Sequence, residues 1–182
     1  MQRSHDKGRE AADELLVIRC QLGDRAAFDA LIARWAAPLA AYARRVTQDG
    51  DAAAELTQDI WLRTFRGIGR LRDPQRFRSW LFGIAHRAFA DSLRQRYATL
   101  PLAAEDADAL ADETMDHENL DLVERSLARL PPVEREILTL FYLQELPIAD
   151  IAEALAIAPG TVKSRLHRAR HLLRDLFEED GE

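Results

Sequence analysis

Cysteine is nearly absent from this chain: Cys20 is the one thiol among its 182 residues. A lone cysteine cannot form an internal disulfide, which excludes a disulfide-stapled fold. We expect Cys20 to be a small buried hydrophobe rather than a reactive thiol. Long apolar runs are also missing. The longest stretch free of polar residues, 35–43, is about half of what a membrane span needs, so the sequence predicts no membrane insertion.

Residue patterns that catalysis uses are missing as well. No glycine-rich phosphate loop and no Ser/His/Asp or Cys/His set is present. His167 and His171 have metal-like spacing, but they lack the intervening glutamate of zinc hydrolases and a third ligand. We therefore predict no enzyme, no cofactor and no metal site. The N-terminus begins MQRSHDKGRE, without a basic-then-apolar signal segment, so the expected compartment is the cytoplasm.

Charge is unevenly distributed along the chain, although the net charge is −6. Residues 61–96 carry nine arginines against two aspartates, whereas residues 98–118 carry seven carboxylates and no lysine or arginine. A second basic segment follows near the C-terminus. Local charge sets the affinity for polyanions, so this pattern predicts two anion-binding surfaces separated by a solvated acidic connector.

The stretch Leu146–Arg174 has the pattern of two short helices joined by a tight turn at 156–158. Proline and glycine follow the turn, where a second helix would begin. One face of this second helix is apolar. The opposite face carries Gly160, Lys163, Ser164, His167, Arg168 and His171, with Arg165 and Arg170 at its margins. This arrangement suits a recognition helix in a major groove; an ordinary amphipathic helix with a solvated basic face has the same pattern.

No stretch alternates with period two, so the predicted fold is all-α, with two small helical domains joined by a flexible acidic linker. Helical spacing breaks near Gly23-Asp24, where Asp24 is a plausible N-cap. We expect further helices over about 52–65, 75–96, 118–130 and 132–143. The predicted organisation is a polar, frayed tail (1–12), a first domain (13–96), the acidic linker (97–117) and a helix-turn-helix domain (118–178).

Aromatic residues lie beside arginines on the helix predicted over 75–96, and two interpretations fit them. Trp80, Phe82 and Phe89 could stack on unpaired bases while guanidinium groups follow the backbone. They could equally be core residues of a helical bundle.

Three motifs together resemble the extracytoplasmic-function (ECF, group 4) sigma factors, the small promoter-recognition subunits of bacterial RNA polymerase in the sigma-70 family. They are DAAAELTQDIWLRTFRGI (51–68), FRSWLFGIAHRAFADSLRQR (77–96) and LARLPPVEREILTLFYLQELPIADIAEALAIAPGTVKSRLHRAR (127–170). The resemblance covers roughly Asp13–Phe177. One helix-turn-helix is weak evidence, whereas three motifs in this order and spacing are specific.

The resemblance implies a bipartite promoter reader that binds core RNA polymerase, with region 2 at 13–96 and region 4 at 118–178. It implies contacts with the clamp helices of the largest polymerase subunit by Glu55, Leu56, Gln58, Asp59 and Trp61. It implies capture of the −10 element as a melted strand by Arg78, Trp80, His86, Arg87 and Arg94. The −35 duplex would be contacted by Lys163, Ser164, Arg165, His167, Arg168, Arg170 and His171, with Lys163, Ser164 and His167 as the base readers.

Arg87 departs from the family pattern, which commonly has an asparagine near this position for a flipped −10 base. Arg87 could read a guanine edge, or it could pair with Asp91 one turn on; we favour the pair. The resemblance also implies control by another protein, commonly an anti-sigma factor. The rival interpretation is a conventional helix-turn-helix regulator that binds DNA as a dimer, but a sensor domain has no need of the arginine-rich segment 61–96.

Overall fold

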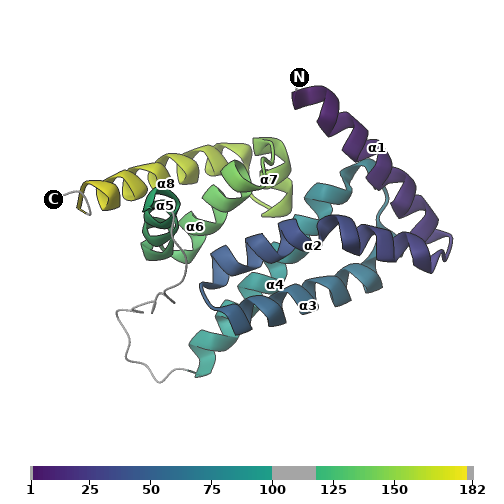
Figure 1. Ribbon diagram of the computed structural model, residues 1–182, viewed down its shortest axis with the longest axis horizontal. Helices are drawn as coiled ribbons and strands as arrows, with labels where there is room; N and C mark the ends of the chain where they lie inside the picture. The colour runs from purple at the N-terminus through teal and green to yellow at the C-terminus, as the bar shows by residue number, and fades with distance from the viewer. Residues whose placement is uncertain (1, 100–117, 180–182) are drawn as a thin grey trace.

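The structure is a computed structural model that describes residues 2–99 and 118–179. Within these residues the chain is helical and contains no strand, which confirms the all-α class (Figure 1). The N-terminal unit comprises α1 (Gln2–Gln21), α2 (Arg25–Thr47), α3 (Gly50–Gly67), the short 3-10 turns η1 (Ile68–Arg70) and η2 (Pro74–Arg76), and α4 (Phe77–Thr99). The C-terminal unit comprises α5 (Glu118–Arg129), α6 (Pro132–Leu138), the π-helical turn η3 (Thr139–Leu143), α7 (Ile148–Ala154) and α8 (Pro159–Glu179).

Helix boundaries in the N-terminal unit follow from local signals. The Asp24 carboxylate accepts a hydrogen bond from the Ala27 amide at 3.3 Å, so it is the N-cap of α2 as expected. Asp49 caps α3 in the same way. Between these helices Gln48 is left-handed, with φ 58°, and closes the end of α2. The segment expected to be a frayed tail belongs to α1, which begins at Gln2.

Proline and turn residues delimit the helices of the C-terminal unit. Pro131 precedes α6, whose first residue, Pro132, needs no hydrogen bond for its nitrogen. Ala156 has φ 53° in the tight turn between α7 and α8. Pro159 then opens α8, so the predicted helix-turn-helix forms as expected. The linker predicted over 97–117 lies outside the described residues from 100 onward, and its first residues extend α4.

The core of the N-terminal unit is rich in aromatic side chains. Phe82 is fully buried and lies edge-on to Trp35 and Tyr42, with ring centroids 6.1 and 5.6 Å apart. Phe89 is also buried, at 2% exposure. Burial decides between the two interpretations of these residues, because a side chain inside the core is not available to stack on a base. Only Trp80 of the three is partly accessible.

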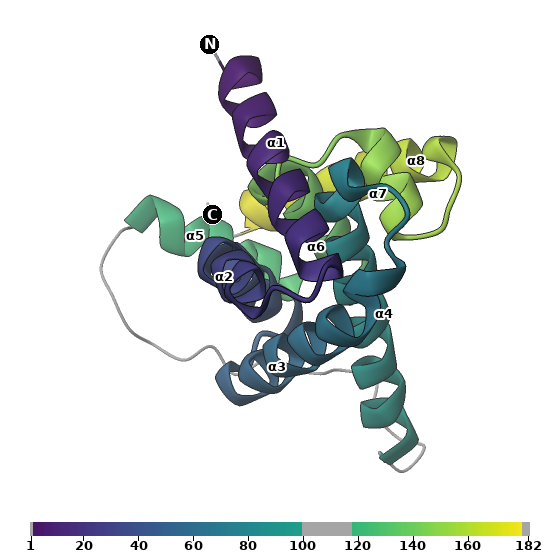
Figure 2. The ribbon, with the colours of Figure 1, turned by 90° about the vertical axis from the view of Figure 1, so that its right-hand side faces the viewer.

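The two units pack directly against each other, which a pair of domains on a flexible linker does not require. Helix α4 lies on α7, and α2 lies along α6 and η3. Figure 2 shows the C-terminal helices beside α2 and α4. The buried residues of both units form one continuous apolar cluster. The two candidate DNA-binding helices are therefore held close together in this structure.

Candidate nucleic-acid interface

Helix α8 presents the predicted polar face to solvent. Its apolar stripe of Val162, Leu166 and Ala169 is buried against the rest of the C-terminal unit. The outward set is exposed: Lys163, Ser164, His167, Arg168, Arg170 and His171. Arg165 is half-buried at the margin. The structure thus brings all seven candidate −35 residues onto one helix, six of them accessible to a ligand.

Several of these side chains already have partners. Arg168 lies 3.3 Å from the buried Glu134 carboxylate, and Arg170 lies over the rings of Phe141 and Tyr142. These contacts hold both cations along the helix surface, where a phosphate backbone would pass. Among the described residues Lys163 makes no ion pair and points outward in the second turn of α8. Lys163 is therefore the cation best placed to reach into a groove.

His167 and His171 form a short hydrogen-bonded series on the same face. Their Nε2 atoms are 3.2 Å apart, and Arg174 Nη2 donates to His171 Nδ1 at 2.8 Å. Because the guanidinium can only donate, His171 Nδ1 is the acceptor, which leaves its Nε2–H to donate to His167. His167 then carries its own proton on Nδ1, as a donor available to a base edge.

The candidate −10 residues on α4 have different environments. Trp80 is half-buried, and its ring packs closely on Gly67. A Cβ added to Gly67 would lie only 3.1 Å from this ring. His86 Nδ1 lies 3.0 Å from Glu136 Oε1 of the C-terminal unit. Arg78 donates to the Gln144 carbonyl, also in that unit. Two of the five candidates are therefore occupied by the other half of the chain.

Arg87 does not pair with Asp91, so the interaction we favoured for it is wrong. Asp91 is engaged instead by Arg63 from α3, at 2.7 Å, and by Arg94. Arg87 is exposed and has no ion-pair partner among the described residues. Sequence spacing identified the i,i+4 neighbour but could not reveal Arg63, which is 28 positions away.

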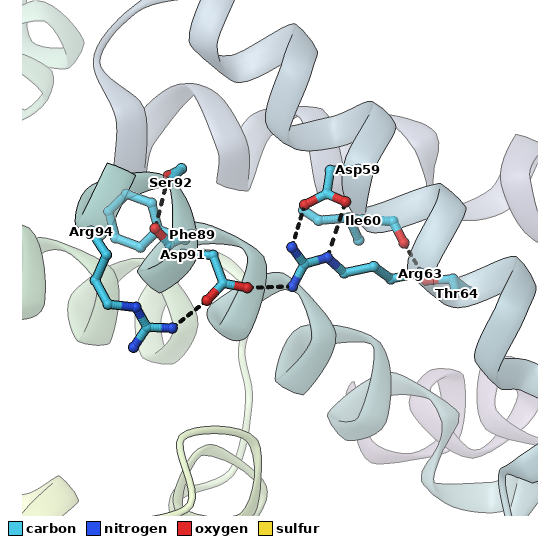
Figure 3. Close-up of polar contacts among 8 residues, drawn as sticks. All are labelled: Asp59, Ile60, Arg63, Thr64, Phe89, Asp91, Ser92 and Arg94. Carbon is cyan, nitrogen blue, oxygen red and sulfur yellow. Dashed lines mark hydrogen bonds and ion pairs between the residues drawn. The ribbon is translucent and has the colours of Figure 1, made fainter. Parts of the chain in front are cut away.

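Arg63 joins two helices through the ion-pair series drawn in Figure 3. Its guanidinium donates to Asp59 on its own helix and to Asp91 on α4. These hydrogen bonds, Asp59 first, raise the pKa of Arg63, and the bond from Arg63 is the main reason that the pKa of Asp91 is lowered. The series fixes the candidate polymerase-binding helix against the candidate −10 helix.

We predict that Arg63→Ala lowers the free energy of unfolding at neutral pH by about 0.5–1 kcal/mol. Asp91 has a folded-state pKa below its ordinary 3.8, so its stabilising contribution is present above pH 3.8 and is lost as pH falls through the lowered value. In the Arg63→Ala variant the free energy of unfolding should therefore fall less between neutral and acidic pH. The pKa of Asp91 should rise, which an NMR titration measures. Arg66→Ala, an exposed arginine on the same helix, is the control and should leave that pKa unchanged.

The residues on the outer face of α3 are not the same as the polymerase-binding residues expected from the sequence. Glu55 and Gln58 are exposed, and Asp59 is partly accessible. Leu56, at 4% exposure, lies in the core, and Trp61 packs edge-on against Phe28. Leu56 therefore supports α3 from inside and cannot contact a partner.

Two apolar residues of this face were missed. Leu62 is 47% exposed and Phe65 is 62% exposed, and they continue the exposed row of Glu55 and Gln58 along α3. The sequence signal was available, because 55, 58, 62 and 65 share one helical face. Apolar residues lie on more than one face of α3, so tertiary packing decides which of them are exposed.

No group of three or more metal-binding side chains occurs in the described parts of the chain. No helix there is long and apolar enough to cross a membrane. Cys20 is half-buried, and burial raises the pKa of its thiol, as expected for a packing residue.

Two family matches were found, one in each helical unit. Residues 31–99 match the family described as Sigma-70 region 2, and residues 120–173 match the one described as Sigma-70, region 4. The ECF RNA polymerase sigma factor SigM of Mycobacterium tuberculosis is 37% identical over 168 residues, which cover 92% of this chain and 86% of SigM. This chain belongs to the ECF group of the sigma-70 family. It is an RNA polymerase sigma factor that directs promoter-specific initiation of transcription.

Other similar proteins agree with this assignment. The RNA polymerase sigma-H factor of Pseudomonas aeruginosa is 30% identical over 176 residues, covering 88% of this sigma factor and 91% of the relative. CnrH, solved in complex with the cytosolic domain of CnrY, has the same fold, with a TM-score of 0.69 at 24% identity over 93% of this chain and 99% of CnrH. RpoE of Bartonella quintana, solved with the anti-sigma factor NepR, has a TM-score of 0.66 at 23% identity, over 83% of this chain and 96% of RpoE.

Proposed function

We propose that this sigma factor binds core RNA polymerase through the exposed row on α3, consisting of Glu55, Gln58, Leu62 and Phe65, with Asp59 at its edge. The row combines polar groups that can confer specificity with two apolar side chains that can be buried. Interfaces gain most of their binding free energy from a few such buried anchors. The observation that carries this assignment is the exposure of two large apolar side chains, Leu62 and Phe65, on a helix whose other large apolar residues pack in or against the core.

The −10 element is then met by α4. Arg87, exposed and unpaired among the described residues, is the residue best placed to hydrogen-bond a base edge, and a bidentate contact to guanine suits its guanidinium. Trp80 offers the partly accessible ring of this helix. Extruding each base costs a few kcal/mol, which such contacts must offset.

The −35 element is read in duplex form by α8, with Lys163, Ser164 and His167 toward the bases. Arg165, Arg168 and Arg170 hold phosphates, and the Glu134 and aromatic contacts keep the last two along the backbone. His171 acts through His167, whose tautomer it fixes. Base contacts specify sequence and phosphate contacts set register.

We predict that Lys163→Ala weakens binding to the cognate −35 element by about 1–3 kcal/mol, because a base contact is lost. The measurement is holoenzyme binding to a series of promoters that differ at single −35 positions. A base-reading lysine gives a loss concentrated on one or two positions. A uniform loss across all promoters would show instead that Lys163 holds a phosphate.

Control of this sigma factor is proposed to lie with a protein partner, because two proteins that share its fold were solved with such partners. An anti-sigma factor could bind the exposed row on α3. It would then cover the surface that core polymerase needs. We propose that the protein acts in the cytoplasm, as a binding subunit without catalytic chemistry of its own.

Run-off transcription with core polymerase, with and without this protein, on a genomic promoter library tests the proposal and returns both promoter elements. We expect initiation only when the protein is present, and enrichment of paired elements near −10 and −35. A conventional regulator would bind duplex DNA without polymerase and would not confer initiation on core enzyme.

A further inference from the structure

Gly67 is the last residue of α3, and its backbone does not require a glycine. Its φ is −101° and its ψ is −22°, a helical conformation that other residues also adopt. Glycine is a poorer helix former than every residue except proline. What a glycine contributes at this position is therefore space beside the helix rather than freedom of the backbone.

The space beside Gly67 is occupied by the Trp80 ring. A Cβ added to Gly67 would lie 3.1 Å from Cζ2 and 3.5 Å from Cη2 of this ring, whereas carbon atoms in good contact are about 3.5–4.0 Å apart. Gly69, two residues on, has no atom within 4 Å of an added Cβ. Gly83 on α4 faces the Ala154 backbone of α7 at 3.5 Å, an ordinary contact. Of these three glycines, only Gly67 has a neighbour that would have to move.

Trp80 has a second aromatic neighbour in the core. Its ring lies 6.0 Å from that of Phe77, centroid to centroid, at a tilt of 38°. Phe77 is fully buried and is itself edge-on to Trp35. A fixed core ring and the end of α3 thus both limit where the indole can lie, although Trp80 stays partly accessible. A ring that is already held in place loses less conformational freedom when it binds.

Trp80 and Arg87 share one face of α4. They are seven residues apart, which is close to two full turns and about 10 Å along the helix axis. Arg87 is the residue proposed to read a −10 base. The accessible part of the Trp80 ring therefore lies within a few nucleotides of that base along the same strand.

We infer that Gly67 is a positioning residue for promoter melting: the space that it leaves holds the Trp80 ring where the ring stacks on a base of the melted −10 strand. Gly67 does not touch DNA and acts through Trp80. A side chain at position 67 displaces the indole and weakens the stacking that offsets the cost of extruding the base. The inference rests on the proposed assignment of α4 to the −10 strand.

The test uses holoenzyme reconstituted from core polymerase and the full-length chain, on a promoter returned by the run-off library. Gly67→Val places a branched side chain against the Trp80 ring. Gly69→Val is the matched control, because the same change there meets open space. Trp80→Phe removes the part of the indole that carries Cζ2 and Cη2, the atoms nearest to Gly67. It provides a background in which Gly67→Val has room.

Two quantities are measured for each holoenzyme: the ratio of open to closed complexes, with a chemical probe for unpaired bases, and the affinity of the closed complex at low temperature. Gly67→Val should lower the open-to-closed ratio by about five-fold or more, the lower limit of what one stacked base contributes. Gly69→Val should match the wild type. In the Trp80→Phe background, Gly67→Val should change the ratio by less than about two-fold, because the two positions are coupled. The closed-complex affinity should be the same in all variants.

An equal loss from Gly67→Val in both backgrounds would overturn the inference, since the effect would then act through the end of α3 and not through the indole. Normal melting by Gly67→Val would overturn it as well, and Trp80→Ala then locates the failure. If Trp80→Ala alone impairs melting, the assignment of Trp80 to the −10 strand stands and only the role of Gly67 is refuted. If Trp80→Ala also melts the promoter normally, that assignment is wrong too.

Discussion

Aspartate at both Leu62 and Phe65 is expected to weaken binding to core RNA polymerase by about 100-fold or more. The two side chains are the exposed apolar part of the α3 row, at 47% and 62% exposure. Interface anchors of this kind contribute about 2 kcal/mol or more when they are truncated, and each 1.4 kcal/mol is a factor of ten in affinity. A carboxylate in a desolvated interface adds a further penalty.

The fold should tolerate this double change, because substitutions at exposed positions usually cost within about 0.5 kcal/mol. Phe65 has one aromatic neighbour, Phe28, with ring centroids 5.1 Å apart, so a modest fall in melting temperature is expected. Leu15→Asp, at an equally exposed apolar position on α1, is the control. Binding is measured by fluorescence anisotropy with purified core enzyme. Equal losses for the control and the double variant would remove α3 as the specific contact.

Glu55→Ala and Gln58→Ala should have smaller effects than the apolar pair, since polar groups at an interface rim remain hydrated. Asp59 is less informative on its own. Its carboxylate also holds Arg63, so a charge reversal there would disturb the joint between α3 and α4 together with any polymerase contact. Leu62 and Phe65 take no part in the ion pairs that join α3 to α4, which makes them the cleaner test of the surface.

The helices that carry the site could be predicted from sequence because their signals are local. Asp24 caps α2 through an amide three residues away, and Pro159 opens α8 directly after the turn. The apolar stripe of Val162, Leu166 and Ala169 repeats at helical spacing and is buried as that spacing indicates. Each of these features depends on residues within a few positions along the chain.

Partners distant in sequence could not be predicted in this way. Arg63 reaches Asp91 across 28 positions, and Tyr42 reaches Glu136 across 94. A single sequence contains no record of such contacts. Helical spacing offered Asp91 two arginines on its own helix, Arg87 and Arg94, and Arg87 was wrongly favoured. It could not offer Arg63, which comes from another helix. Leu56 was misjudged for a related reason, since motif membership does not say which side of the helix is buried.

The packing of the two units against each other also depends on contacts between residues distant in sequence, and it could not be predicted either. Composition separates two basic segments by an acidic one, but it gave no sign that Glu136 would be buried among residues of the first unit. The relevant signal was present as Gly83, a glycine inside a helix, where only a close backbone contact justifies the loss of helix stability. A glycine inside a predicted helix can therefore be used to predict where another helix crosses it.

Phe82→Ala is expected to lower the free energy of unfolding by about 3–5 kcal/mol, the usual cost of truncating a fully buried phenylalanine. Phe82 is at the centre of the aromatic cluster, edge-on to Trp35 and Tyr42, and its loss leaves a cavity that these rigid rings cannot fill. Tyr42 also donates to Glu136, so the damage should spread to the contact between the units. Chemical denaturation followed by circular dichroism measures the loss.

Phe82→Leu is the matched control, because it keeps an apolar side chain of similar bulk and should cost clearly less than the alanine variant. The pair also separates a core role from base stacking. A stacking residue would lose affinity for the melted −10 strand in both variants, since leucine offers no ring, and would leave stability almost unchanged. A core residue gives the opposite result: the leucine variant keeps both stability and strand binding, and the alanine variant loses both together because the scaffold under α4 is weakened. An alanine variant as stable as the wild type would contradict the packing described for this helix.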